Sequence, residues 1–288
     1  MTCILITGAD GLLGYDLMKT LSQGKDHHVI ATNRQRFDIT DLEATTSFLE
    51  EARPEVIVHA AAFTDVDACE IEKERAFQTN ASGARNVALA ARRVGAKLVY
   101  ISTDYVFDGV KEAPYQEEDR PNPINIYGAS KWEGERLVQE ECPESFIVRT
   151  AWLYGIRGKS FVKTMLRLAQ TEKEISVVHD QRGTPTWSHD LARQLQALIA
   201  TDRYGIYHAT SQGSCSWYEF ALAIFRASGL PVQVQPVPSE RFPRAARRPR
   251  NSVLENRRLG ELGLHLMSPW EQSLAQFLKV LNQEASPL

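Results

Sequence analysis

A tyrosine and a lysine four residues apart, Tyr127 and Lys131, could form one acid–base device. Four residues are just over one helical turn, so both side chains would project from the same helix face. A phenol normally titrates near ~10 and a lysine near ~10.4, and an ammonium fixed beside the phenol brings the phenol pKa closer to the working range. Taken alone, such a pair is most often a solvated helix face, so its meaning depends on the rest of the chain.

The N-terminal segment carries glycines in the context that dinucleotide binding requires. A short apolar run from Cys3 leads into Gly8, Gly11 and Gly14, and a helical leucine pattern follows. Such glycines allow a tight turn, close backbone approach to a pyrophosphate and close packing of helix on strand. The first N–H groups of the helix and its dipole favour phosphates. We therefore expect a cofactor to contact Gly8, Asp10, Gly11, Leu12, Leu13 and Gly14.

The composition indicates a soluble globular protein. Of 288 residues 43% are hydrophobic and 24% charged, and the net charge of -3 argues against nucleic acid as the main partner. The four scattered cysteines and the seven histidines suggest neither a disulfide framework nor a metal site. Met1 leads almost directly into a strand, and no apolar run approaches membrane-spanning length. We expect a reduced cytoplasmic protein without a metal.

Strand and helix patterns alternate along the first half of the chain. Strands are expected at residues 29–32, 54–60, 97–102 and 146–152. Helices are expected at 41–51 with Asp41 as N-cap, from the mid-60s to about Val94, from Tyr127, and more loosely at 161–171, 189–201, 217–228 and 270–282. Repeated strand–helix units predict an α/β fold with a doubly wound parallel sheet. We assign residues 1–150 to a Rossmann-like cofactor domain and 151–288 mainly to a smaller substrate lobe, with some segments returning to the sheet.

Ligands of such sheets bind at the carboxyl ends of the strands, where further motifs fall. Ala60, Ala61 and Ala62 follow the third strand and could let a cofactor lie against the sheet edge, or could simply be tight core packing. Thr103 follows the fourth strand and could donate a hydrogen bond to a substrate carbonyl, or could cap a turn.

Together these motifs resemble the extended short-chain dehydrogenase/reductase superfamily, in which the spacing G-x-x-G-x-x-G is familiar. More narrowly, the chain resembles the dTDP-4-dehydrorhamnose reductase family over nearly its whole length. The narrower likeness rests on the segments at 102–109, 149–154, 180–186 and 248–252.

The resemblance implies a nicotinamide-dependent reduction of the C4 ketone of dTDP-4-dehydro-L-rhamnose to dTDP-L-rhamnose. Tyr127 would donate the proton, Lys131 would lower the pKa of Tyr127 and bind the nicotinamide ribose, and Thr103 would stabilise the developing oxyanion. The substrate would also contact Asp104, Tyr105 and Trp152. The cofactor would contact Asp38, Ile39, Ala60, Ala61 and Ala62 as well as Tyr127 and Lys131.

The residues after the second strand bear on the choice of cofactor. An Asp or Glu at that strand end favours NADH, whereas arginines accommodate a 2′-phosphate. Here Asn33 and Arg34 occupy the position, and no carboxylate occurs until Asp38. We expect NADPH, with NADH possible; alternatively, Arg34 is a solvated loop charge.

A basic segment holds arginines 241, 244, 247, 248 and 250. A solvated loop would explain it, and so would a clamp on the diphosphate of a nucleotide sugar, because arginine forks suit phosphates. Arg248 is our choice for that clamp. A nucleic-acid patch fits the acidic net charge poorly.

Other assignments remain open at this stage. Some members of the family are described as dimers bridged by magnesium; Asp16 matches one carboxylate, but His189 replaces another, so we expect a monomer or homodimer and no metal. A related epimerase or dehydratase would share the fold, although dehydratases commonly have Asp-Glu after the threonine where this chain has Asp104 and Tyr105. A non-catalytic subunit resembling the regulatory subunit of methionine adenosyltransferase is the third possibility.

Overall fold

The computed structural model describes residues 1–23 and 26–285, and its main element is a six-stranded sheet with the order β10-β5-β4-β3-β1-β2. Every neighbouring pair in it is parallel. The strands are β1 (Thr2–Thr7), β2 (His27–Ala31), β3 (Val56–His59), β4 (Lys97–Thr103), β5 (Ser145–Thr150) and β10 (Gly205–His208). Strands β3 and β5 are buried throughout, as expected of a parallel sheet covered on both faces.

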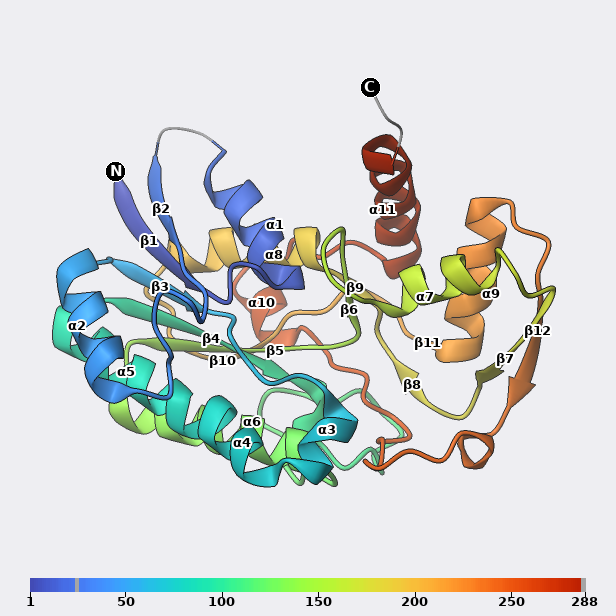
Figure 1. The fold of residues 1–288 in the computed structure, drawn as a ribbon, viewed down its shortest axis with the longest axis horizontal. Coiled ribbons are helices and arrows are strands. Elements are labelled where there is room, and N and C mark those ends of the chain that lie inside the picture. The colour runs from blue at the N-terminus through green and yellow to red at the C-terminus, as the bar shows by residue number, and fades with distance from the viewer. Residues whose placement is uncertain (24–25, 286–288) are drawn as a thin grey trace.

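Helices cover the two faces of this sheet (Figure 1). Apolar residues of α1 (Leu12–Leu21) and α8 (Ser188–Ile199) share one core with β1 and β3. Residues of α2 (Leu42–Ala52), α5 (Gly83–Val94) and α6 (Ile126–Glu141) form the core on the opposite face. Asp41 caps α2 by accepting a hydrogen bond from the Ala44 amide at 3.0 Å, as predicted. The expected doubly wound parallel sheet is confirmed.

The long helix expected before Val94 is broken into shorter elements. The structure has α3 (Val66–Ile71), α4 (Lys73–Phe77), a π-helical turn at Gln78–Ser82 and then α5. The Asn80 side chain bonds both the amide and the carbonyl of Phe63, at 2.7 and 3.0 Å. This pairing holds the π turn against the loop that follows β3, which a sequence pattern does not reveal. Residues at helical spacing along this region are nevertheless all buried, at Ala76, Asn80, Ala84, Val87 and Ala91.

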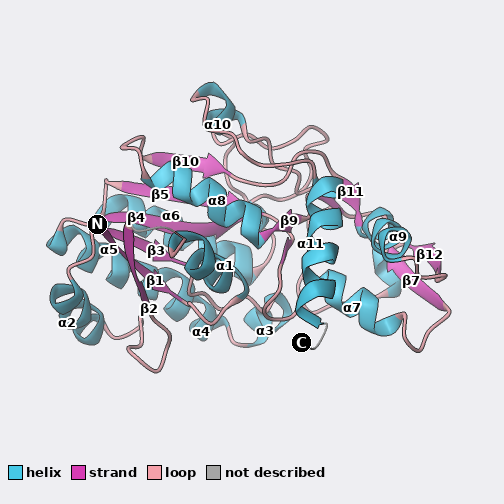
Figure 2. Ribbon diagram, turned by 90° about the horizontal axis from the view of Figure 1, so that it is seen from above, coloured by secondary structure: helices cyan, strands magenta, loops and turns pink. Residues whose placement is uncertain are grey.

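A smaller group of elements lies beside the main sheet, with its own apolar core (Figures 1 and 2). Its helices are α7 (Phe161–Leu168), α9 (Trp217–Ser228) and α11 (Trp270–Ala285). Its strands pair as β6 (Leu153–Tyr154) with β9 (Thr186–Trp187), β8 (Arg182–Gly183) with β11 (Cys215–Ser216), and β7 (Glu174–Val178) with β12 (Gln233–Val237). Short helical segments occur at Asp104–Val106, Ser239–Arg241 and α10 (Arg257–Glu261). Strand β10 is part of the main sheet and helix α8 packs on one face of it, although both follow residue 150. The chain therefore returns to the main sheet after residue 150, and the boundary between the two domains stays a prediction.

No helix within residues 1–23 and 26–285 combines the length and apolar character needed to cross a membrane.

A buried ion pair fastens α6 to the sheet. The Arg149 side chain on β5 is 1% exposed, and its Nη2 and Nε lie 2.7 and 2.9 Å from the two carboxylate oxygens of Glu135 on α6. Ser102 on β4 donates to the same carboxylate at 2.5 Å. These contacts fix the C-terminal half of α6, the helix that carries Tyr127 and Lys131.

We predict that Arg149→Met strongly destabilises the protein. It would leave the Glu135 carboxylate buried without its cation, which typically costs about 3–5 kcal/mol of unfolding free energy. Urea unfolding measures this cost. Arg136→Met is the matched control, because it breaks an ion pair with Glu133 on the exposed side of the same helix and should change stability little. Equal, small effects of both variants would contradict the assignment.

Candidate active site

A cleft of about 1060 Å³ opens at the carboxyl ends of the sheet strands. It is lined by residues one or two positions beyond the ends of five of the strands: Gly8 after β1, Asn33 after β2, Ala60 after β3, Asp104 after β4 and Trp152 after β5. Crossovers of a parallel sheet bring these ends together, so residues far apart in sequence share one site.

The glycine turn packs tightly against the loop after β3 and against α1 only because it lacks side chains. Gly8 has φ +68°, and a Cβ there would lie 2.8 Å from the Ala61 backbone; a Cβ on Gly14 would lie 2.2 Å from the Gly8 carbonyl oxygen. Gly11 begins α1 without a side-chain cap, so the first amides of that helix stay free for an anion. These features fit a dinucleotide. Every predicted cofactor contact lines the cleft: Gly8, Asp10, Gly11, Leu12, Leu13, Gly14, Asn33, Arg34, Asp38, Ile39, Ala60, Ala61, Ala62, Tyr127 and Lys131.

The far end of the cleft, beyond β2, is polar. Asn33 donates a 2.6 Å hydrogen bond to the Asp10 carboxylate, which joins the glycine turn to the loop after β2. The Arg34 guanidinium lies 3.0 Å from Asp38, and its side chain is 76% exposed. An exposed guanidinium at this position is open to an additional anion.

Helix α6 presents Tyr127 and Lys131 to the cleft. Asn125 caps the helix by accepting a 2.7 Å hydrogen bond from the Gly128 amide. The ammonium of Lys131 is buried and sits 3.9 Å from the centroid of the Tyr100 ring. Burial lowers the pKa of Lys131 to about 7, although Glu135 opposes the shift. Thr103, Tyr127 and Lys131 all line the same cleft, as the sequence predicted.

The protonation of Tyr127 differs from the expectation. Burial raises the pKa of Tyr127 well above its usual value, a hydrogen bond with Thr103 lowers it, and the Asp104 carboxyl raises it further. Lys131 is not among the groups that shift the pKa of Tyr127, and its ammonium lies over the Tyr100 ring. The Tyr127 phenol therefore keeps its proton at neutral pH and is available as an acid.

Asp104 is a buried carboxyl beside these groups. Its side chain accepts a 3.0 Å hydrogen bond from Thr103 and is 3% exposed. Burial raises the pKa of Asp104 to about 7, while hydrogen bonds with Ser252 and Thr103 oppose the shift. Asp104 and Tyr105 line the cleft, so both predicted substrate contacts are in place to meet a ligand.

A tryptophan pair forms the wall of the cleft on the side of the smaller lobe. The rings of Trp152 and Trp217 stack 3.4 Å apart with 6° between their planes, and both line the cleft. Trp152 has φ +46°, and a Cβ on Gly183 would lie 2.3 Å from its ring. Trp152 was predicted, whereas Trp217 was not. Trp217 begins a helix 65 positions later, and no local pattern links it to the cleft.

Arg248 is held beside the cleft by several partners. Its guanidinium makes a two-pronged ion pair with the Asp67 carboxylate at 2.6 and 3.0 Å and also donates to the Ala246 carbonyl. It is not among the described residues that line the cleft. The guanidinium also hydrogen-bonds with Tyr105, which lines the cleft. Arg248 thus ties the basic segment to α3 and to the edge of the cleft, and its role as a clamp on a substrate diphosphate stays a prediction.

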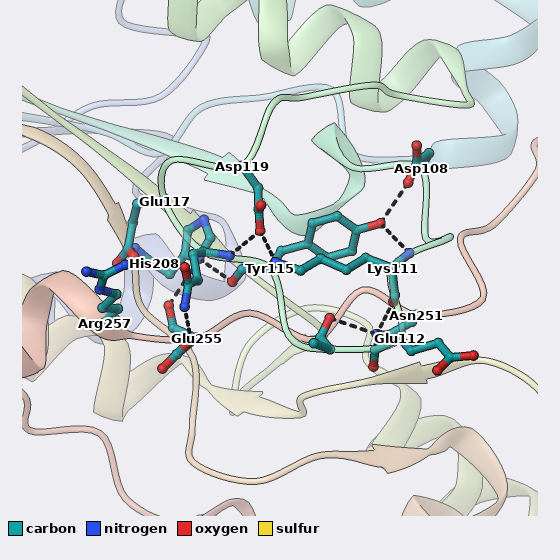
Figure 3. A network of polar contacts seen from close by, with 12 residues as sticks. Asp108, Lys111, Glu112, Tyr115, Glu117, Asp119, His208, Asn251, Glu255 and Arg257 are labelled. Carbon is teal, nitrogen blue, oxygen red and sulfur yellow. Dashed lines mark hydrogen bonds and ion pairs between the residues drawn. The ribbon is translucent and has the colours of Figure 1, made fainter.

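The segment that follows Arg248 is held against the loop after β4 by a polar network (Figure 3). Tyr115 donates to the Asp108 carboxylate at 2.7 Å, and Asn251 donates to the Lys111 carbonyl at 2.7 Å. The buried His208 ring also contacts this region, through the carbonyl of Tyr115 at 3.1 Å. The network places Ser252 beside Asp104.

Asp16 is not positioned as a surface metal ligand. It is 3% exposed and accepts a hydrogen bond from Ser188, and burial raises its pKa. In the part of the chain that the structure describes, no three His, Cys, Asp or Glu side chains gather in a way that could hold a metal ion.

We predict that the stability of the protein relative to Asp104→Asn falls as pH rises from 5 to 8. The pKa of Asp104 is near 7 in the folded state and near 4 in the unfolded state. The folded state therefore binds this proton more tightly than the unfolded state does, and it loses that stabilisation as the pH rises. The expected relative loss is about 2 kcal/mol, measured by urea unfolding at both pH values. Asp108→Asn is the control: hydrogen bonds from Tyr115 and Asn122 outweigh burial and lower the pKa of Asp108, so it is ionised at both pH values. A pH-independent difference for Asp104→Asn would refute the raised pKa.

Comparison with known proteins identifies the family. The family model described as "RmlD substrate binding domain" matches residues 1–283. The dTDP-4-dehydrorhamnose reductase of Streptomyces griseus is 43% identical, over 96% of this chain and 93% of its own length. The dTDP-4-keto-6-deoxy-D-glucose reductase of Streptomyces niveus is 41% identical over 98% of each chain. The crystal structure of dTDP-4-dehydrorhamnose reductase from Bacillus anthracis in complex with NADP superimposes with a TM-score of 0.95 and 46% identity, covering 97% of this chain and all of that one. This chain therefore belongs to the dTDP-4-dehydrorhamnose reductase (RmlD) family of extended short-chain dehydrogenases/reductases.

Proposed function

We propose that this chain uses NADPH to reduce the C4 ketone of dTDP-4-dehydro-L-rhamnose to dTDP-L-rhamnose. The observation that carries the proposal is the meeting of Thr103, Tyr127 and Lys131 in one cleft with a glycine turn that fits a dinucleotide. The names of the relatives supply the substrate class, and the NADP in the Bacillus anthracis structure supports the cofactor.

The residues of the cleft suit proton donation to a carbonyl. A bound nicotinamide would supply the hydride, and the Tyr127 phenol, kept protonated by burial, would give its proton to the carbonyl oxygen at C4. The Thr103 hydroxyl points at Asp104 in this structure and would turn to stabilise the growing negative charge on that oxygen. Protonation of Asp104 would favour that turn, because a neutral carboxyl accepts hydrogen bonds more weakly. Lys131 would bind the nicotinamide ribose.

The remaining alternatives concern the sugar and the reaction. The Streptomyces niveus relative is named for a different 4-keto sugar, so that substrate is a second candidate for this cleft. An epimerase, a dehydratase or a binding subunit without turnover would have the same cleft. None of them would cause net oxidation of NADPH. We place the activity in the cytoplasm, in a monomer or homodimer.

We predict that the wild-type protein oxidises NADPH when it is given dTDP-4-dehydro-L-rhamnose, and that Tyr127→Phe loses roughly 10²–10⁴ of that rate, because the phenol is the proton donor. Loss of nicotinamide absorbance measures turnover, and quenching of protein fluorescence checks that the variant still binds NADPH. Near-wild-type turnover in a variant that binds cofactor would sink the mechanism. Cofactor binding by the wild type without consumption would favour a binding subunit or another keto-sugar.

We predict that Arg34→Asp weakens NADPH binding by roughly 10- to 100-fold relative to NADH, because a charge-assisted contact to the 2′-phosphate is lost. The dissociation constants of both cofactors measure the effect. Arg36→Asp is the matched control: it makes the same charge change two residues away, at a side chain that does not line the cleft. Should the cofactor preference stay unchanged in Arg34→Asp, Arg34 would be a solvated loop charge.

A further inference from the structure

The cleft must neutralise two diphosphates if the proposed function holds, one from the cofactor and one from the nucleotide sugar. Among the described residues, four basic side chains line it: Arg34, Arg75, Lys131 and Lys159. Since phosphates are bound chiefly by cations and free backbone amides, the state of each of these four side chains decides which of them is available.

Three of the four cations already have partners. Arg34 is paired with Asp38 at 3.0 Å. Arg75 is paired with Glu72 at 2.7 Å and covers the Phe63 ring. Lys131 is buried over Tyr100, in the place that the acid–base chemistry requires.

Lys159 differs from these three side chains. It is exposed, and no carboxylate pairs with it in residues 1–23 and 26–285. A cation that lines a ligand cleft without an acidic partner is free to bind an anion from solution.

The loop that carries Lys159 is fixed from both sides. Lys163 on α7 donates to the carbonyls of Ile156 and Gly158, which holds the loop to the start of that helix. The guanidinium of Arg157 lies 5.0 Å from the Tyr15 ring on α1. The backbone of Lys159 is therefore held between α1 and α7, and only its side chain needs to be ordered by a ligand.

The helix termini around the cleft indicate which diphosphate meets Lys159. The start of α1 has no side-chain cap, so its amides are free for the phosphates of the cofactor. The start of α7 is capped by Ser160, and the start of α9 by Ser216 within a capping box. On the side of the smaller lobe each helix start thus has fewer free amides than the start of α1, and a side-chain cation would be the stronger partner for a second diphosphate there.

The tryptophan pair lies on that side and includes Trp152, the predicted contact for the sugar nucleotide. Phe161, two residues after Lys159, packs its ring 4.6 Å from Trp217, and Trp217 stacks on Trp152 at the cleft wall. Building on the proposed function, we propose that Lys159 binds the diphosphate of the nucleotide sugar. It would do the task that the sequence pattern had suggested for Arg248, whose guanidinium is occupied by Asp67.

Isothermal titration of dTDP and, separately, of NADPH tests this assignment without requiring turnover. We expect Lys159→Gln to weaken dTDP binding by roughly 10- to 100-fold and to leave NADPH binding within about twofold, since a hydrogen-bonded charge is lost from one ligand only. Lys159→Arg should restore most of the dTDP affinity. Arg167→Gln is the matched control, because it removes an exposed cation of α7 that does not line the cleft, and should leave both affinities unchanged.

The opposite patterns overturn the proposal. Weakened NADPH binding with unchanged dTDP binding would assign Lys159 to the cofactor, and unchanged binding of both would make it a surface charge. Failure of the wild-type protein to bind dTDP would overturn this inference together with the proposed function. If the wild-type protein binds dTDP but oxidises no NADPH, only the proposed reaction is overturned. The dTDP affinities of the wild type and Lys159→Gln would still test the role of Lys159.

Discussion

The candidate active site depends on one helix, α6, whose inner face is packed against the sheet and shielded from water. Tyr127, Lys131 and Glu135 follow one another at intervals of four residues along α6, so they share a face. Glu135 ends this row in a buried ion pair with Arg149 and a hydrogen bond from Ser102. A buried pair of this kind adds little net stability over an apolar contact, but it tolerates only one orientation of the helix. The positions of Lys131 and Tyr127, one and two helical turns before Glu135, follow from that constraint.

The same burial explains why three neighbouring groups have shifted pKa values. Burial penalises the charged form of every group, so the pKa values of Tyr127 and Asp104 rise while that of Lys131 falls to about 7. No separate cause is needed for each residue. The common environment brings an acid, a neutralisable base and a carboxyl that titrates near neutrality within one cleft, as an acid–base site requires.

The parts of the site that could be predicted are those encoded locally. The glycine turn, the Asp41 cap and the spacing of Tyr127 and Lys131 each involve residues within a few positions, and all were found where expected. The features that were not predicted involve contacts over long sequence distances. The pairing of Arg248 with Asp67 and the stack of Trp217 on Trp152 join segments that only the folded topology brings together. The π turn at Asn80 likewise arises from its bonds to Phe63, and no helical period anticipates it.

The protonation of the cleft also bears on how a carbonyl oxygen would receive its proton. Reduction of a ketone needs a proton donor, whereas oxidation of the alcohol needs a base. The raised pKa makes the Tyr127 phenol a weaker acid, but it keeps the proton on the phenol at neutral pH, where a reduction needs it. Asp104, near half protonation at pH 7, limits the negative charge that would otherwise oppose an alkoxide forming beside Thr103. Before any ligand binds, Tyr127 thus holds the proton that reduction of a carbonyl consumes, and Asp104 adds less negative charge than a fully ionised carboxylate would.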